Sequence, residues 1–207
     1  MKKVGIVDFG MGNINSICNA LKFIGSEFTI VLKPDDLNNL THIILPGVGS
    51  FKKAMTNLSS LDLVEKIRNS VLSEKKKILG ICLGMQLLGS SSTEDGYTEG
   101  LSLINNKVRI FSSKETIQKN IPHIGFNTIK IFNNRTFFFN KIDDNSNFYF
   151  IHSYRMLREE LIDNYALCNY GSDFLAAFNY NNIFGTQFHP EKSQSNGLQL
   201  IYNFLVS

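Results

Sequence analysis

Residues 77–88 read Lys77-Ile78-Leu79-Gly80-Ile81-Cys82-Leu83-Gly84-Met85-Gln86-Leu87-Leu88 and place a cysteine between two glycines, directly after an apolar run. Residues 78–81 predict a short buried strand, and residues 84–88 predict the start of a helix. Cys82 would then lie at a tight turn, where small flanking residues permit a strained backbone. A helix N-terminus behind the turn favours the thiolate, the nucleophilic form of cysteine. The stretch therefore predicts a strand–turn–helix unit carrying a cysteine nucleophile, with a buried, inert cysteine as the alternative.

The same strand–helix alternation extends through the first half of the chain. Apolar runs at residues 4–9, 28–32 and 41–45 predict strands, and apolar residues at helical spacing predict helices over 14–24 and 61–72. Alternating strands and helices are typical of a parallel sheet that is covered by helices on both faces.

The second half of the chain has a different pattern. Short runs rich in aromatic and branched residues predict strands at 108–111, 128–132, 148–151, 166–170 and 175–180, followed by a strand at 183–188 and a helix at 196–206. These runs indicate antiparallel strands or a mixed continuation of the sheet. We therefore predict an α/β fold with an open, mostly parallel, doubly wound sheet, helices on both faces and an antiparallel extension in the second half.

Composition limits the classes of function. A chain of 207 residues, 43% of them hydrophobic and with a net charge of +3, predicts one domain spanning residues 1–207. We expect no nucleic-acid partner, because the charge is small and the lysines are scattered. No apolar stretch has the length of a membrane span or a signal peptide, so neither is expected. Three cysteines without a Cys-x-x-Cys pair predict neither a disulfide framework nor a metal site, as in a reduced, cytoplasmic protein.

A cysteine nucleophile needs a base, and the base needs a group that orients it. His189 lies at the end of the apolar run Gly185-Thr186-Gln187-Phe188-His189-Pro190-Glu191, where the proline ends the strand. Glu191 is close enough for its carboxylate to accept the far imidazole N–H. Because the carboxyl ends of parallel strands meet at one edge of a sheet, Cys82, His189 and Glu191 form a possible catalytic triad. The zinc-deaminase interpretation of His-x-Glu fails, since that chemistry also needs a Pro-Cys-x-x-Cys motif.

Two glycine-containing segments follow the first and third predicted strands. Pro46-Gly47-Val48-Gly49-Ser50 is able to present backbone N–H groups to a developing oxyanion, although an ordinary glycine-rich turn explains it equally well. Residues 8–13 resemble a dinucleotide-binding loop only superficially, because position 15 is Asn and no acidic residue ends the second strand. We therefore predict no nucleotide cofactor, and no other cofactor.

Several motifs together resemble one known family. Residues 80–86 and 185–193 are similar to the two signatures of triad-type (class I) glutamine amidotransferases. Four further segments, at 8–13, 46–51, 122–125 and 148–154, resemble the branch formed by the glutaminase subunits of imidazole glycerol phosphate synthases. The similarity runs from residue 5 to residue 193.

The resemblance implies a reaction and a set of site residues. Cys82 would attack the carboxamide of glutamine, His189 would transfer protons, and Glu191 would orient His189. The residues matching the family's other site positions are the oxyanion loop Gly47, Val48 and Gly49 and the glutamine-binding residues Gln86, Glu94, Ser153 and Tyr154.

The resemblance also implies a partner. The ammonia would pass, in a heterodimer, to a (β/α)8-barrel cyclase subunit of histidine biosynthesis. Phe126 departs from the family, which usually has Trp at this position facing the cyclase. This departure leaves open an ammonia donor to a sugar-modifying synthase as an alternative. Two further alternatives are a non-catalytic regulatory subunit and a stand-alone cysteine peptidase or hydrolase.

Overall fold

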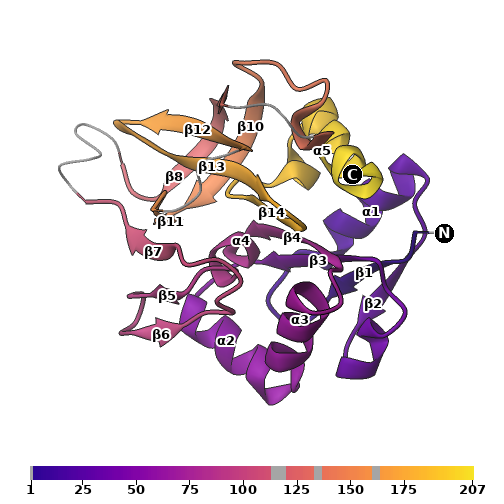
Figure 1. The fold of residues 1–207 in the computed structure, drawn as a ribbon. Helices are drawn as coiled ribbons and strands as arrows, with labels where there is room; N and C mark the ends of the chain where they lie inside the picture. The colour runs from indigo at the N-terminus through magenta and orange to yellow at the C-terminus, as the bar shows by residue number, and fades with distance from the viewer. Residues whose placement is uncertain (1, 113–119, 133–136, 160–163) are drawn as a thin grey trace.

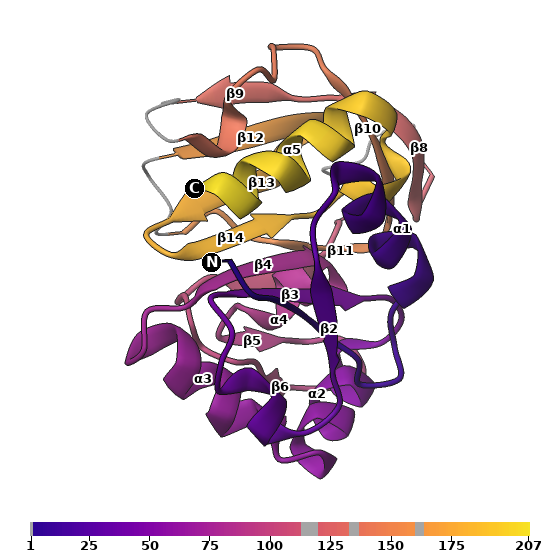
Figure 2. The same ribbon diagram turned by 90° about the vertical axis from the view of Figure 1, so that its right-hand side faces the viewer.

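An eight-stranded sheet forms the centre of the computed structural model, which describes residues 2–112, 120–132, 137–159 and 164–207 (Figures 1 and 2). The strand order is β2-β1-β3-β4-β14-β13-β12-β9. The parallel part contains β1 (Val4–Val7), β2 (Phe28–Val31), β3 (His42–Gly47), β4 (Lys77–Cys82) and β14 (Ile183–Thr186). The antiparallel part adds β13 (Ser172–Tyr180), β12 (Asn164–Tyr170) and β9 (Lys130–Phe132). The predicted fold class is confirmed.

Helices cover both faces of this sheet. One face packs against α1 (Ile14–Ile24) and α5 (Gln194–Val206), and the other against α2 (Phe51–Ser60) and α3 (Leu63–Leu72) (Figures 1 and 2). The inner strands β1, β3 and β4 are apolar along nearly their whole length because both of their faces are buried. In the parts of the chain that the structure describes, no helix is both long and apolar enough to cross a membrane.

Two smaller sheets lie beside the main one. In the first, β8 (His123–Thr128) pairs antiparallel with β10 (Asn147–His152). The second has the order β11-β7-β5-β6, with β11 (Tyr154–Met156), β7 (Lys107–Ile110), β5 (Ser91–Ser92) and β6 (Thr98–Glu99). The strand predicted at 128–132 is in fact divided, since β8 ends at Thr128 and β9 begins at Lys130. The described residues also form three short 3-10 helices: η1 (Pro34–Leu37), η2 (Phe137–Phe139) and η3 (Pro190–Lys192).

The turn between β4 and α4 (Leu83–Leu87) carries Cys82 in a strained conformation, with φ 54° and ψ −110°. The glycines two residues before and two residues after Cys82 leave no room for a side chain. A Cβ on Gly84 would lie 1.7 Å from the carbonyl oxygen of Leu45, and one on Gly80 would lie 2.6 Å from the carbonyl oxygen of Gly84. The predicted strand–turn–helix unit is therefore confirmed. The helix that follows this turn, α4, has only five residues.

Candidate active site

The order of the strands brings Cys82 and His189 together. Strands β4 and β14 are parallel neighbours, with Ile81 paired to Thr186, so both chains leave the sheet at the same edge. Cys82 follows Ile81 directly, and His189 lies three residues beyond Thr186. Strand β3 ends at this edge too, since Gly47 pairs with Cys82. The carboxyl edge of three adjacent strands thus carries the predicted nucleophile, base and oxyanion loop, as open α/β sheets arrange their ligand sites.

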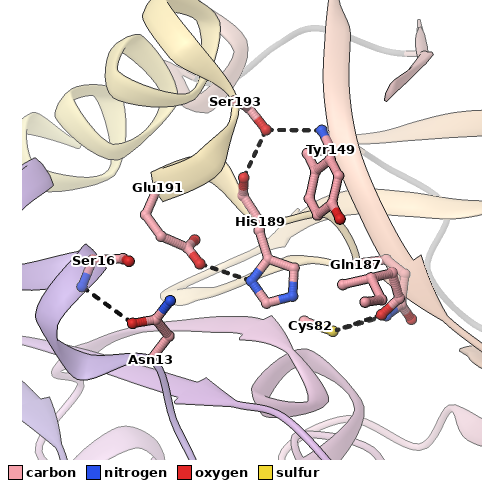
Figure 3. A network of polar contacts seen from close by, with 9 residues as sticks. Asn13, Ser16, Cys82, Tyr149, Gln187, His189, Glu191 and Ser193 are labelled. Carbon is pink, nitrogen blue, oxygen red and sulfur yellow. Dashed lines mark hydrogen bonds and ion pairs between the residues drawn. The ribbon is translucent and has the colours of Figure 1, made fainter. Parts of the chain in front are cut away.

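Glu191 holds His189 from behind, as Figure 3 shows. The Nδ1 of His189 lies 2.7 Å from Oε1 of Glu191, and both side chains are only 2% exposed. The backbone is fixed as well: the N–H of His189 donates to the carbonyl of Tyr149 at 2.9 Å, and the hydroxyl of Ser193 donates to the carbonyl of His189 at 2.6 Å. The imidazole therefore has a fixed orientation, with Nδ1 as the donor to the carboxylate.

The charge on His189 is set by its two neighbours. Burial alone would lower the pKa of the imidazole, but the interactions with the sulfur of Cys82 and the carboxylate of Glu191 raise that pKa to about 10. The Nε2 of His189 has no hydrogen-bond partner at good geometry among the described residues, and it points to the side on which Cys82 lies (Figure 3). This arrangement suits an imidazolium that faces a thiolate, with a proton ready for a leaving group.

A cavity of about 350 Å³ opens above the cysteine. Its lining contains nearly all of the predicted site residues: Val48, Gly49, Cys82, Gln86, Glu94, Ser153, Tyr154 and His189. Leu83, Ile151, His152 and Lys192 also line it and were not among the predicted site residues. Two predicted residues lie outside the lining, because Gly47 is buried at the end of β3 and Glu191 stands behind His189.

Gln86 connects the cavity wall to a buried residue that the sequence analysis missed. Its Nε2 donates to the carbonyl of Tyr154 at 2.9 Å and to Oε1 of Gln187 at 3.1 Å. Both hydrogens of the Gln86 amide are thereby used, which leaves its carbonyl oxygen to accept a hydrogen bond from a ligand. Gln187 is fully buried, and its Nε2 lies 3.8 Å from the sulfur of Cys82.

Glu94 joins the cavity to the helix that follows the oxyanion loop. Its Oε2 accepts the backbone N–H of Phe51 at 2.8 Å, and the hydroxyl of Ser50 donates to the neighbouring Asp95 at 3.1 Å. Burial raises the pKa of Glu94, the Phe51 N–H opposes that rise, and the charge of Asp95 adds to it. Glu94 is therefore an acidic group at the cavity wall, suited to a ligand with an ammonium group.

The predicted oxyanion loop, residues 47–49, has one backbone amide that is already engaged elsewhere. The N–H of Val48 donates to the carbonyl of Met11 at 2.9 Å, so this donor is already engaged. Gly49 has a φ of +101°, a conformation that favours glycine. Leu83 opens α4, and an N–H in the first turn of a helix has no partner within the helix. In this conformation the loop supplies less than a complete pair of oxyanion donors.

Two buried histidines support the wall made by residues 153 and 154. The Nδ1 of His152 lies 2.8 Å from the carbonyl of Tyr154, and its Nε2 lies 3.3 Å from Nδ1 of His123. Burial lowers the pKa of His152 to about 3; the Tyr154 carbonyl opposes the shift, and the charges of His123 and His189 add to it. His152 is therefore neutral at physiological pH and donates from Nδ1.

This neutral histidine predicts a loss of stability in acid. The unfolded chain takes up the proton near the ordinary pKa of 6.5, whereas folded His152 resists it down to about 3. The free energy of unfolding should consequently fall below pH 6.5, by up to about 1.4 kcal/mol per pH unit from this residue. In His152→Asn, where an amide N–H replaces Nδ1–H, we expect a shallower decline between pH 6.5 and 4.5 in urea denaturation. His42, with its pKa lowered to about 4, keeps its own contribution in both proteins. Equal slopes for the two proteins would contradict this role of His152.

Comparison with protein families gives one match over almost the whole chain. The model described as "Glutamine amidotransferase class-I" matches residues 5–207. A protein of Parasynechococcus marenigrum named "Imidazole glycerol phosphate synthase subunit HisH 1" is 44% identical over 206 residues, which cover 99% of this chain and 98% of the relative. A protein of Leptospira interrogans named "Imidazole glycerol phosphate synthase subunit HisH" is 42% identical over 202 residues, covering 97% and 98%.

Two solved structures that share this fold are more distant in sequence. "Structure of PurLQS from Thermotoga maritima" contains a chain with a TM-score of 0.76 at 20% identity, covering 99% of this chain and 98% of that one. "Crystal structure of glutamine amidotransferase" gives a TM-score of 0.74 at 18% identity, covering 98% and 97%. At these identities the similarity concerns the fold alone.

Proposed function

This chain belongs to the class-I glutamine amidotransferase family, and on that premise we infer that it is the glutaminase subunit of an imidazole glycerol phosphate synthase in histidine biosynthesis. We propose further that residues 1–207 form one amidotransferase domain in the cytoplasm, without a cofactor. The observation that carries the chemistry is the Glu191–His189 pair, 2.7 Å apart, beside a strained cysteine at the edge of the same sheet.

The proposed mechanism uses Cys82, His189 and Glu191 in turn. The thiolate of Cys82 attacks the carboxamide carbon of glutamine, a C–S bond forms, and the carbonyl oxygen becomes an oxyanion. Protonated His189 gives its proton to the amide nitrogen, the C–N bond breaks, and ammonia leaves. Neutral His189 then takes a proton from water, whose oxygen attacks the glutamyl thioester and releases glutamate and the thiolate. Glu191 keeps the imidazole oriented throughout.

The cavity suits glutamine at both of its ends. The carboxamide would lie at Cys82, beneath the oxyanion loop of Gly47, Val48 and Gly49. We propose that Glu94 receives the ammonium group of the substrate, because its carboxyl group lines the cavity and is half-buried. Gln86 and the backbone of Ser153 and Tyr154 would hold the rest of the head group.

A partner surface adjoins this cavity. Strands β8 and β10 expose Ile124 (57%), Phe126 (52%) and Ile151 (39%), and Ile151 also lines the cavity. Exposed apolar side chains gathered beside a site support docking of another protein. We propose that a (β/α)8-barrel cyclase subunit binds here, forms a heterodimer and receives the ammonia.

The engaged amide of Val48 predicts that the protein alone is a poor glutaminase. The loss of one oxyanion donor costs about 10²- to 10³-fold in rate. We therefore expect glutamate release to rise by about that factor when a barrel cyclase and its ribulose-nucleotide ligand turn this N–H from Met11 towards the cavity. Glutamate is measured for the protein alone, with the barrel, and with both the barrel and its ligand.

The outcomes of this experiment separate the alternatives. A steep rise only in the full mixture supports the proposal. A rate that stays low with the histidine-pathway barrel, while a glutamine-like electrophile still labels Cys82, points instead to a sugar-modifying synthase. A failure of Cys82 to react at all would indicate a non-catalytic subunit, and hydrolysis of peptides without any partner would indicate a stand-alone hydrolase.

A further inference from the structure

The side chain of Gln187 is buried and contacts the sulfur of Cys82, but it has no role in the mechanism proposed above. It follows β14 immediately, its exposed fraction is 0%, and its backbone N–H donates to the carbonyl of Ala176 at 2.8 Å. Its Nε2 lies 3.8 Å from Sγ of Cys82, and Figure 3 draws this contact as a dashed line. Both the position of the backbone and the burial leave this amide little freedom to move.

The hydrogen bonds around Gln86 decide which end of the Gln187 amide faces the sulfur. The Gln86 amide nitrogen lies within 2.9 Å of the Tyr154 carbonyl, which can only accept a hydrogen bond. The second hydrogen of the same nitrogen needs another acceptor, which Oε1 of Gln187 provides at 3.1 Å. Since the oxygen of Gln187 faces Gln86, its NH2 group must face Cys82.

The state of the sulfur changes what its neighbours can offer. As a thiol, Cys82 donates to the carbonyl of Ile151 at 3.8 Å. Once the proton has left, this contact joins two acceptors and no longer stabilises the sulfur. The thiolate then depends on groups that carry hydrogen, and the amide of Gln187 is such a group already in place.

We propose that Gln187 is a further catalytic residue, which donates a hydrogen bond from Nε2 to the Cys82 thiolate and is held in the donating orientation by Gln86. Gln86 is thereby a positioning residue in addition to any contact with substrate. The thiolate is also the species regenerated when the thioester is hydrolysed, so the same hydrogen bond serves both ends of the reaction cycle.

The test measures the nucleophile without any partner or glutamine. Cys82 is alkylated with iodoacetamide at pH 7, and the peptide that contains it is quantified by mass spectrometry. Gln187→Met keeps the approximate volume but removes the donor, and a hydrogen bond to a charged group corresponds to a loss of about 10- to 100-fold in alkylation rate. In strongly alkaline solution the rates of variant and wild type should converge, because the thiol is then ionised without help.

Thr186→Val is the matched control. Thr186 is the adjacent residue, it is equally buried, and its hydroxyl has no hydrogen-bond partner among the described residues. We expect its alkylation rate to stay within about twofold of wild type, as for a substitution that removes no interaction. An unchanged rate at pH 7 in a folded Gln187→Met protein would overturn the inference. If that variant is not recovered folded, Gln86→Met decides, since it frees the Gln187 amide to rotate and should slow alkylation in the same direction; an unchanged rate there would count equally against the proposal.

A second experiment measures steady-state kinetics with glutamine, and it rests on the proposed function. In the complex with a barrel cyclase, Gln187→Met should lower kcat for glutamine with little change in KM, whereas a merely disordered cavity would raise KM. The two hypotheses fail separately. If the wild-type protein releases no glutamate with any barrel, the proposed function is refuted, and the role of Gln187 is still tested by the alkylation rate. If Gln187→Met shows normal turnover and normal alkylation, only the role of Gln187 is refuted.

Discussion

Cys82→Ala is expected to lower glutamine-dependent glutamate release by at least about 10⁴-fold, the scale seen when the nucleophile of a triad is removed. The reason is that the proposed reaction passes through a C–S bond, and Cys82 is the only cysteine among the described residues that line the cavity. The measurement is glutamate release in the presence of the barrel cyclase and its ligand. With ammonium salt in place of glutamine, the same mixture should still form the cyclase product, because that step needs only ammonia.

Cys168→Ala supplies the matched control for this variant. Cys168 is buried in β12, and burial together with the charge of Asp173 raises the pKa of its thiol to about 12, so it is inert at neutral pH. Its loss should leave glutaminase turnover within a few-fold of wild type. Glutamine-dependent turnover retained by Cys82→Ala would exclude the proposed mechanism.

Glu191→Gln is expected to lower turnover by about 10³- to 10⁴-fold, in line with the effect of replacing the carboxylate of a triad by an amide. The amide of Gln can present either its N–H or its carbonyl oxygen to Nδ1 of His189, so the imidazole loses its fixed tautomer. The carboxylate is also one of the two groups that hold the pKa of His189 at about 10. The pKa in the variant should be lower, so less His189 is protonated at neutral pH, and the alkaline limb of the kcat/KM profile should move to lower pH.

The control for this variant keeps the charge. Glu191→Asp retains a carboxylate on a side chain that is one methylene shorter. We expect its activity, and the pH of the alkaline limb of its kcat/KM profile, to lie between those of Glu191→Gln and the wild type. Glu99→Gln, on the exposed strand β6, should have no effect on either quantity. If Glu191→Gln turned over within tenfold of wild type and kept the same pH profile, Glu191 would not be the orienting residue.

The sheet was predictable where the sequence pattern reflects burial on both faces. Strands β1, β3 and β4 are apolar along nearly their whole length, and each was predicted within two residues of its ends. Helix α2 was missed because lysines, serines and threonine surround its narrow apolar stripe, although Phe51, Ala54 and Leu58 have helical spacing and are fully buried.

Strand β8 was missed for a different reason. Its apolar side chains, Ile124 and Phe126, are exposed, whereas the side chain of His123, the first residue of the strand, is buried. This is the reverse of the pattern on which strand prediction depends, and it is the pattern expected of a strand that meets a partner.

The site was predictable to the extent that strand ends determine it. Cys82 and His189 each follow an apolar run, and parallel strands bring such positions together. The sequence does not predict a role for Gln187. Its one unusual feature is an amide side chain between Thr186 and Phe188, near the end of an apolar strand. The direction of the Val48 N–H could not be predicted either, because the glycines on both sides allow the peptide to point in either direction.

The place of β14 in the sheet has a consequence for the newly made protein. Gln187 and Cys82 are 105 residues apart in sequence, and β14 enters between β4 and β13. On a ribosome that adds about 5–20 residues per second, Cys82 is made roughly 5 to 20 seconds before His189. During that interval β4 lacks its neighbour on one side, and the cysteine has neither His189 nor Gln187. Under the proposed mechanism an unfinished chain therefore cannot release free ammonia, because the triad is complete only when β14 has been inserted and His189 follows it.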